Sequence, residues 1–307
     1  EPVLATSEEE ILSASQSVYV PVPVNTILAK VEAFPGRLAY VGLPDQVSSI
    51  RQLQALGHGP SKKIEIILGP YVGTYMYFEA IESFLSSNGV FDLNEVVRLK
   101  YREGEWPGHL CIELGNGRLL TADKFYYNYL IPFFVTNSSL MSVDFTNELT
   151  DISVGDAWHP RYEKKGGGYS AIIARSENGL HILEDLRHKK RISLEKKGYS
   201  DFVSMHAHMI EFKKRGAFIR MGLRKKFGKA VPEYGYQVRN IPQRRTLIEL
   251  CIMAIFAVCR TRTAKRLLRQ VPIRWMGPLF NHLRISWKRI SKPGKREGLL
   301  DLEFEIR

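Results

Sequence analysis

The sequence predicts an α/β (α+β) fold, in which a small mixed sheet with flanking helices is followed by a basic helical C-terminal extension. Two apolar stretches, 37–42 and 63–68, are each followed by a turn and a helical pattern, which is typical of a parallel α/β unit. Alternating segments then indicate antiparallel strands between residues 96 and 121. The pattern is helical from residue 201 onward, so we expect two domains, over 1–200 and 201–307.

The first part of the chain carries a local signal for each element. Ser7 and Glu10 have the spacing of a capping box, which predicts a helix over residues 7–12. Pro21 and Pro23 interrupt a β-rich stretch, so we expect an edge strand or an extended segment there. The other predictions in this part are a short helix over 25–32, strands over 37–42 and 63–68, and helices over 46–56 and 74–85.

The middle of the chain is predicted to contain a hairpin. Gly115-Asn116-Gly117 separates two alternating segments, and such a turn favours antiparallel pairing. The strands are predicted over 96–102, 109–114, 118–121, 151–155 and 170–175, and helices over 124–130 and 178–186. Farther on we expect helices over 202–227, 247–258, 264–268 and 279–290, with a linker over 232–242.

The net charge of +12 comes from 44 Lys and Arg against 32 Asp and Glu, and it is concentrated near the C-terminus. Residues 211–300 contain 23 basic and 4 acidic residues. A hydrophobic fraction of 44% excludes bulk disorder. Three cysteines are too few for a disulfide framework and lack metal-ligand spacing, so we expect a reducing, cytoplasmic location.

The N-terminus lacks the pattern of a signal peptide, and no apolar run is long enough to suggest a membrane span. The chain begins with Glu1 and not with Met, as a fragment or a processed form would. Its longest apolar run covers residues 250–259, well short of the ~20 residues that a transmembrane helix needs. We therefore expect a buried or interfacial helix there.

Three stretches have the composition of a binding site. Residues 41–47 place a Gly-x-Pro turn between a strand and a helix, which forms either an anion site or a plain β–α turn. Residues 144–158 are rich in carboxylates, which could bind a cation or hydroxyl groups or line a solvated loop. Residues 164–170 contain three consecutive glycines, which suit either close backbone approach to a ligand or a flexible loop.

The pair His206 and His208 is not expected to bind a metal. Residues two apart on a helix point to different faces, and no third ligand lies nearby in the sequence.

Several stretches between residues 2 and 183 match, in order, the motifs of one protein family. They are VLATSEEEIL of residues 3–12, SVYVPV of 17–22, VGLPDQV of 41–47, DFTNELTDISVGDAW of 144–158, and GYS of 168–170 with Arg175. On these residues the chain resembles the coenzyme F420 hydrogenase/dehydrogenase beta-subunit family, in its C-terminal domain. This family includes 7-hydroxymethyl chlorophyll a reductase-like proteins.

The resemblance implies a flavin-dependent oxidoreductase or electron-transfer subunit that binds FAD within residues 1–200. In the family the flavin works beside 4Fe-4S clusters. The flavin contacts carried over by motif position are Ser17, Tyr19, Gly42, Pro44, Gln46, Gly155, Asp156 and Ser170.

Four positions at which the family has cluster-binding cysteines are occupied by other residues: Asp45, Val72, Ser139 and Ser142. Iron–sulfur clusters are held by thiolates, so we expect neither a 4Fe-4S cluster nor another metal in this chain. The family motif around Ser17 also has a Gly and a Lys where this chain has Gln16 and Val18.

An alternative hypothesis is a non-catalytic scaffold or partner subunit that keeps the fold and docks through its basic C-terminal region. The expected partner is a redox protein or subunit. The basic segment also suits an anionic membrane surface, which would make the protein membrane-peripheral, and nucleic acid is the less favoured partner. A solvated basic face explains the same charges.

Overall fold

A computed structural model describes residues 1–123, 127–296 and 303–306. The chain forms two compact units, each assembled from several segments. The first unit comprises Glu1–Ser15, Val22–Gly73 and Asp144–Ala207, and the second comprises Gln16–Pro21, Thr74–Val143 and His208–Arg307. The expected division into domains over 1–200 and 201–307 stays a prediction.

The first unit is built on a four-stranded mixed sheet with the order β1-β2-β6-β7. The strands are β1 (Leu38–Val41), β2 (Ile64–Pro70), β6 (Ile152–Asp156) and β7 (Ser170–Ala174). β1, β2 and β6 run parallel, and β7 pairs antiparallel with β6. The prediction of a parallel α/β unit with a small mixed sheet is therefore confirmed.

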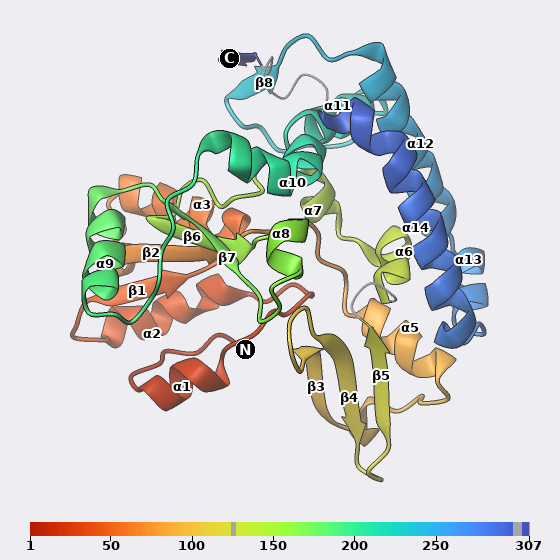
Figure 1. Cartoon of the computed structure of the whole chain (residues 1–307), viewed down its shortest axis with the longest axis horizontal. Coiled ribbons are helices and arrows are strands. Elements are labelled where there is room, and N and C mark those ends of the chain that lie inside the picture. The colour runs from red at the N-terminus through yellow and green to blue at the C-terminus, as the bar shows by residue number, and fades with distance from the viewer. Residues whose placement is uncertain (124–126, 297–302, 307) are drawn as a thin grey trace. The chain divides into compact units, whose positions relative to one another are not determined.

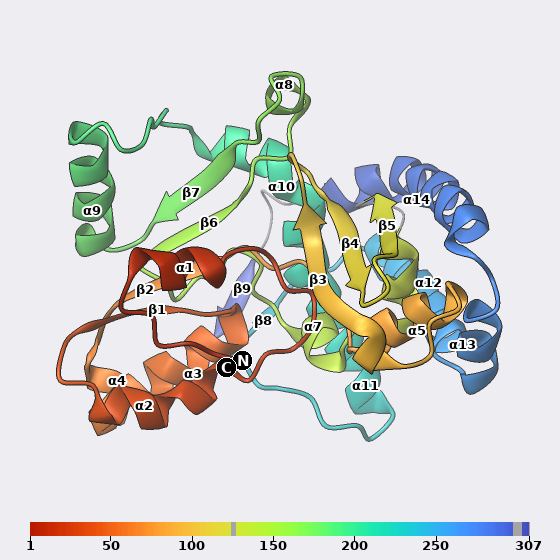
Figure 2. The same cartoon turned by 90° about the horizontal axis from the view of Figure 1, so that it is seen from below.

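Helices cover this sheet because their inward faces are apolar. Val47 and Ile50 of α3 (Pro44–Ala55) are fully buried and pack in one cluster with Tyr40 of β1 and with Ile64 and Ile67 of β2. The other helices of this unit are α1 (Glu8–Ser13), η1 (Val24–Ile27), α2 (Leu28–Ala33), α4 (Gly59–Lys62), α8 (Pro160–Glu163) and α9 (Glu177–His188). Figures 1 and 2 show α2 and α3 beside β1 and β2, and α9 beside β7.

The second unit contains an antiparallel sheet of β3 (Val96–Glu103), β4 (His109–Leu114) and β5 (Leu119–Asp123). The predicted hairpin at Gly115–Gly117 is confirmed, and Gly117 has a φ of 81°, which favours glycine. The helices before and after this sheet are α5 (Glu79–Ser87), η2 (Leu93–Glu95), η3 (Tyr127–Leu130), α6 (Ile131–Phe134) and α7 (Asn137–Met141). Phe84, Leu110 and Phe134 lie in the main apolar core of this unit.

The predicted helical C-terminal region is present. It consists of α10 (Tyr199–Lys213), α11 (Arg215–Lys226), α12 (Gln243–Cys259), α13 (Arg262–Leu268) and α14 (Ile273–Arg296). Figures 1 and 2 show α12 and α14 as neighbours. A short strand, β8 (Tyr236–Val238), pairs with β9 (Phe304–Ile306).

Several element predictions were wrong in detail. The helix predicted over 74–85 begins only at Glu79. Of the two alternatives for residues 18–24, an edge strand or an extended segment, the strand is absent. The helix predicted over 202–227 is interrupted at Lys214, whose ψ of −88° separates α10 from α11. The linker predicted over 232–242 contains β8. This strand was not predicted because its partner, β9, lies more than 60 residues later in the sequence. Residues 124–126 of the helix predicted over 124–130 lie outside the described residues.

Candidate functional site

Six of the eight predicted flavin contacts gather at one edge of the four-stranded sheet. Because β1, β2 and β6 are parallel, their carboxyl ends meet there, with Val41 beside Leu68 and Pro70 beside Val154. The antiparallel strand β7 begins at the same edge. The residues brought together are Gly42, Pro44, Gln46, Gly155, Asp156 and Ser170, and Asp156 lies directly opposite Ser170.

The turn after β1 is held by side-chain amides. Gln46 accepts a hydrogen bond from the Leu43 N–H at 2.8 Å and donates one to the Val22 carbonyl at 2.7 Å. Asn147 donates to the Gly42 carbonyl at 2.7 Å, while its buried Oδ1 has no hydrogen-bond partner among the described residues. The amide of Gln46 therefore shapes the turn. Asn147 lies in the matched 144–158 motif but was not among the predicted flavin contacts.

An aromatic cluster fills the space above Gly155. A Cβ at this position would lie 2.1 Å from the ring of Tyr71, so only glycine permits the ring to pack there. Tyr71, Phe145, Phe202 and His206 form the cluster, with ring centroids 5.0–5.9 Å apart. Gly155 therefore has a packing role, because the absence of a side chain allows the Tyr71 ring to lie against its backbone.

His206 is a neutral imidazole inside this cluster. Only 2% of its surface is exposed, and its Nε2 has no hydrogen-bond partner among the described residues. Burial lowers the pKa of His206 to about 4, although Asp156 favours the charged form. Burial also raises the pKa of Tyr71, against the opposing influence of Arg175 and Ser153.

Two arginines tie the loop that precedes β6 to the sheet. Arg51 of α3 pairs with Asp151 at 3.1 Å, and the same carboxylate accepts the Ile67 N–H at 2.7 Å. Arg175 donates to Ser153 Oγ at 2.6 Å and to Thr146 Oγ1 at 3.0 Å. These bonds fix the acidic stretch 144–158, which the sequence left open as either a binding site or a solvated loop.

A basic, glycine-rich loop leads into β7 at the same edge. Gly166, Gly167 and Gly168 all have φ between 70° and 74°. A Cβ added at Gly166 or Gly167 would meet no atom within 4 Å, so this backbone is open to approach. Exposed Lys164 and Lys165 precede the glycines. Consecutive backbone N–H groups with nearby cations are suited to phosphate oxygens.

An aromatic pair flanks the glycine-rich loop. The rings of Tyr162 and Tyr169 have centroids 5.2 Å apart, and Lys165 Nζ lies 5.5 Å above the ring of Tyr169. Exposed Arg161 lies in α8 beside Tyr162. Sequence reasoning did not select the two tyrosines or Arg161 as contacts, although Tyr169 lies in the matched GYS motif. Aromatic residues on both sides of a Lys-Lys-Gly-Gly-Gly run were a visible signal.

The other two predicted flavin contacts, Ser17 and Tyr19, belong to the second unit. There the ring of Tyr19 packs edge-on against Tyr101, with centroids 5.4 Å apart. The carbonyl of Tyr19 accepts the Met76 N–H at 2.9 Å. Their expected role toward a flavin stays a prediction.

The four positions that carry cysteine in the resembling family are distributed over both units. Asp45 is exposed in the first turn of α3, and Val72 follows β2. Ser139 and Ser142 are buried in the second unit, where Ser139 Oγ accepts the Tyr75 N–H at 3.3 Å. Among the described residues, no group of three or more His, Cys, Asp or Glu side chains is arranged to hold a metal ion.

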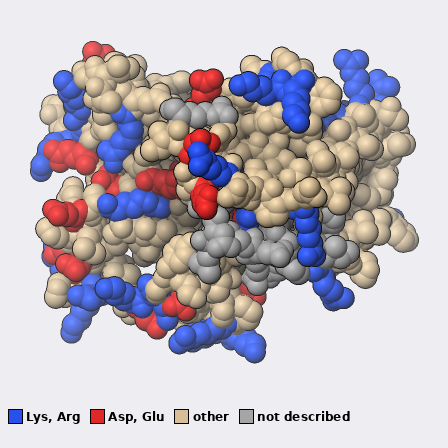
Figure 3. All heavy atoms as spheres, turned by 90° about the horizontal axis from the view of Figure 1, so that it is seen from above, with Lys and Arg blue, Asp and Glu red and all other residues tan. Residues whose placement is uncertain are grey.

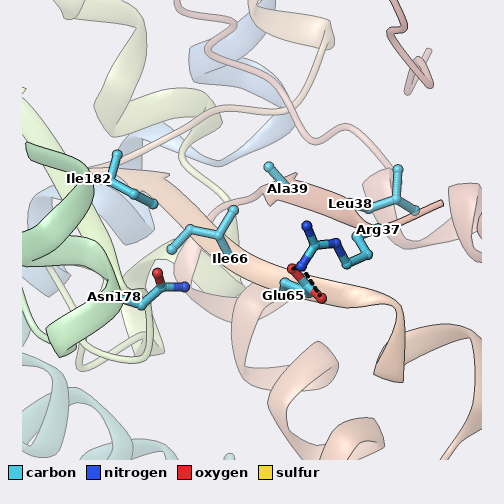
Figure 4. Close-up of a pocket in the computed structure, with 7 residues that line it drawn as sticks. All are labelled: Arg37, Leu38, Ala39, Glu65, Ile66, Asn178 and Ile182. Carbon is cyan, nitrogen blue, oxygen red and sulfur yellow. Dashed lines mark hydrogen bonds and ion pairs between the residues drawn. The ribbon is translucent and has the colours of Figure 1, made fainter. Parts of the chain in front are cut away.

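A shallow hollow of the first unit, drawn in Figure 4, lies away from this edge. It is lined by the amino-terminal parts of β1 and β2 and by α9. Arg37 and Glu65 form an ion pair of 3.1 Å at its margin. It contains none of the predicted site residues, and all seven lining residues are labelled in Figure 4.

Comparisons with known proteins give consistent results. The family model for the C-terminal part of the coenzyme F420 hydrogenase/dehydrogenase beta subunit matches residues 36–198. A coenzyme F420-dependent sulfite reductase of Methanocaldococcus jannaschii is 26% identical over 207 residues, which cover 63% of this chain and 30% of that protein. The chain therefore spans about a third of the length of this curated relative.

A solved structure shares the fold. It is a chain of the F420-reducing NiFe hydrogenase complex from Methanosarcina barkeri, with a TM-score of 0.54 and 17% sequence identity. The match covers 75% of this chain and 77% of that one.

Proposed function

Because the chain belongs to the coenzyme F420 hydrogenase/dehydrogenase beta-subunit family, we propose that it is a flavin-linked electron-transfer subunit. The observation that carries the proposal is the strand register of the first unit. It brings six residues, predicted separately from three motifs, to the carboxyl edge of one sheet. Ligands of α/β sheets bind preferentially at this edge.

The residues at this edge fit a flavin dinucleotide in two respects. The open glycine backbone and the cations Arg161, Lys164 and Lys165 suit a pyrophosphate. Tyr162 and Tyr169 offer exposed or half-buried rings for stacking. When bound, FAD would supply hydride and single-electron chemistry. The chain would hold the phosphates, orient the rings and set the local charge.

Two of the predicted contacts would act indirectly. The side-chain amide of Gln46 is already hydrogen-bonded to the Leu43 N–H and to the Val22 carbonyl, and the ring of Tyr71 covers Gly155. Both residues would shape the edge without touching the cofactor. Ser170 is exposed at the start of β7 and Asp156 is half-buried opposite it, so these two are the stronger candidates for direct contact.

We also propose that this chain holds no 4Fe-4S cluster and exchanges electrons through a partner subunit. Val72 is a hydrocarbon side chain and cannot coordinate iron. Ser139 uses its Oγ to accept the Tyr75 N–H, and its carbonyl accepts a hydrogen bond from Lys213 at 2.9 Å. Side chains without thiolates make poor cluster ligands. The cytoplasmic location stays a prediction beside this proposal.

The visible spectrum of the full chain tests the flavin. FAD is added, the protein is desalted, and a retained flavin band is expected. Lys165→Gln should weaken FAD binding roughly 10- to 100-fold, because hydrogen bonds to charged groups contribute about 1.5–3 kcal/mol. Gly167→Ala should also weaken it. Gly117→Ala is the matched control, since Gly117 has a similar φ of 81° and equally open surroundings in the second unit.

A protein that stays colourless after this treatment contradicts the proposal. It supports the alternative of a non-catalytic scaffold or partner subunit that retains the fold. Two observations favour that alternative. The cluster-binding cysteines of the family are replaced, and the Gln46 amide is hydrogen-bonded within the chain itself. If Gly167→Ala and Gly117→Ala weaken FAD binding equally, the glycine-rich loop is not part of the binding site.

A further inference from the structure

Helix α12 of the second unit exposes several large apolar side chains, although it buries two charged residues beside the apolar Ile252. Its buried face contains Arg245 and Glu249, which are 1% and 0% exposed. Its outward face contains Leu247 and Val258, which are 62% and 67% exposed, together with Leu250. Helices of water-soluble domains ordinarily bury the apolar stripe and expose the charges. The outward apolar face therefore requires an explanation beyond packing of this unit.

Buried ion pairs hold α12 in this orientation. Arg245 pairs with Glu249 at 2.7 Å and with Glu211 of α10 at 3.1 Å. Arg220 of α11 pairs with Glu249. Gly216 makes room for the network, because a Cβ there would lie 2.6 Å from Arg245 Nη2. Breaking such a buried pair is costly, so α12 cannot turn to hide its leucines.

The next two helices extend the apolar face. Leu267 of α13 is 59% exposed, and Trp275, Leu279 and Leu283 of α14 are all more than half exposed. The three α14 residues have the spacing of one helical face. Met276 and Phe280, on another side of α14, pack against the core instead. We call the outward side chains of α12, α13 and α14 the basic–apolar surface.

The charge of this surface has one sign. Glu249 is the only acidic residue between residues 243 and 296, and it is buried, whereas the same span contains 14 Lys and Arg. Exposed cations among the described side chains are Arg244, Arg262, Arg266, Arg269, Arg274 and Arg289. The right-hand third of Figure 3 shows blue side chains around uncharged surface and no red ones.

We propose that the basic–apolar surface docks on an anionic lipid bilayer. Exposed leucine, valine and tryptophan side chains would enter the headgroup boundary, and arginines around them would meet lipid phosphates. Charge complementarity selects anionic over neutral lipid. No described helix is long and apolar enough to cross a bilayer, so the contact would be peripheral. The proposal concerns the second unit and is independent of the flavin.

Sedimentation of the full chain with vesicles tests the proposal. We expect binding to phosphatidylcholine vesicles containing phosphatidylserine, little binding to pure phosphatidylcholine, and release by salt. Val258→Glu should weaken binding at least tenfold. Val97→Glu is the matched control, since Val97 on β3 is 68% exposed and lies outside the surface. Arg262→Gln combined with Arg266→Gln should weaken binding roughly 25-fold, about fivefold for each charge.

Three outcomes would overturn the proposal. One is no sedimentation with anionic vesicles at low salt, and another is equal loss in Val258→Glu and Val97→Glu. The third is self-association in light scattering that Val258→Glu abolishes while vesicle binding is absent. That result would assign the surface to a second copy of the chain. Circular dichroism of each variant shows that lost binding does not reflect unfolding.

Discussion

His206 should make the stability of the first unit depend on pH. The imidazole is 2% exposed, and its pKa is lowered from the ordinary 6.5 to about 4. Between these values the unfolded chain binds a proton that the folded chain does not, so stability falls as the pH falls. The loss is complete only below pH 4, where the folded imidazole is protonated as well. At pH 5.0 the loss relative to pH 7.5 is roughly 2 kcal/mol, from 1.5 pH units at about 1.4 kcal/mol each.

Urea unfolding at pH 7.5 and pH 5.0 measures this loss. His206→Phe keeps an aromatic ring beside Tyr71 and Phe202 but cannot take up the proton. The variant should therefore lose roughly 2 kcal/mol less than the wild type on acidification. His181→Phe is the control, because it makes the same replacement at an exposed position of α9. If the wild type and His206→Phe lose stability equally, the burial argument is refuted.

Three further substitutions test the packing. Asp151→Asn should lower the free energy of unfolding by about 1.5–3 kcal/mol, because its carboxylate accepts from both Arg51 and a backbone N–H; an unchanged urea midpoint would contradict this. Gly155→Ala should cost about 1–3 kcal/mol and alter the near-ultraviolet circular dichroism, because the methyl group meets the Tyr71 ring; wild-type values would exclude this packing. Glu249→Gln should cost about 3–5 kcal/mol in urea unfolding, whereas Glu233→Gln, at an exposed position, should be near neutral.

The sequence was sufficient to predict the elements with strong local signals. The capping box at Ser7 and Glu10 is present, and the two apolar stretches form the parallel strands β1 and β2. The Gly-Asn-Gly turn closes the expected hairpin. In each of these cases neighbouring residues alone decide the backbone conformation.

Other features depend on partners that are distant in the sequence. β8 pairs with residues 304–306, so its formation as a strand cannot be predicted from the residues within 232–242 alone. The family resemblance is confirmed, and the register explains why motifs more than 100 residues apart converge on one edge. The aromatic cluster around His206 could not be predicted, because it joins residues from β2's end, the 144–158 stretch and α10.

The buried ion network of α10, α11 and α12 also restricts how this sequence can change over time. Glu249 forms ion pairs with two arginines, and only a glycine at position 216 leaves room for their side chains. A single replacement leaves a buried charge without its ion-pair partner. Simultaneous replacement of several of these residues by apolar ones could leave the helices packed. We therefore expect relatives to keep or lose Glu211, Gly216, Arg245 and Glu249 as one set. This set is a marker by which alignments could trace the lineage of the C-terminal region.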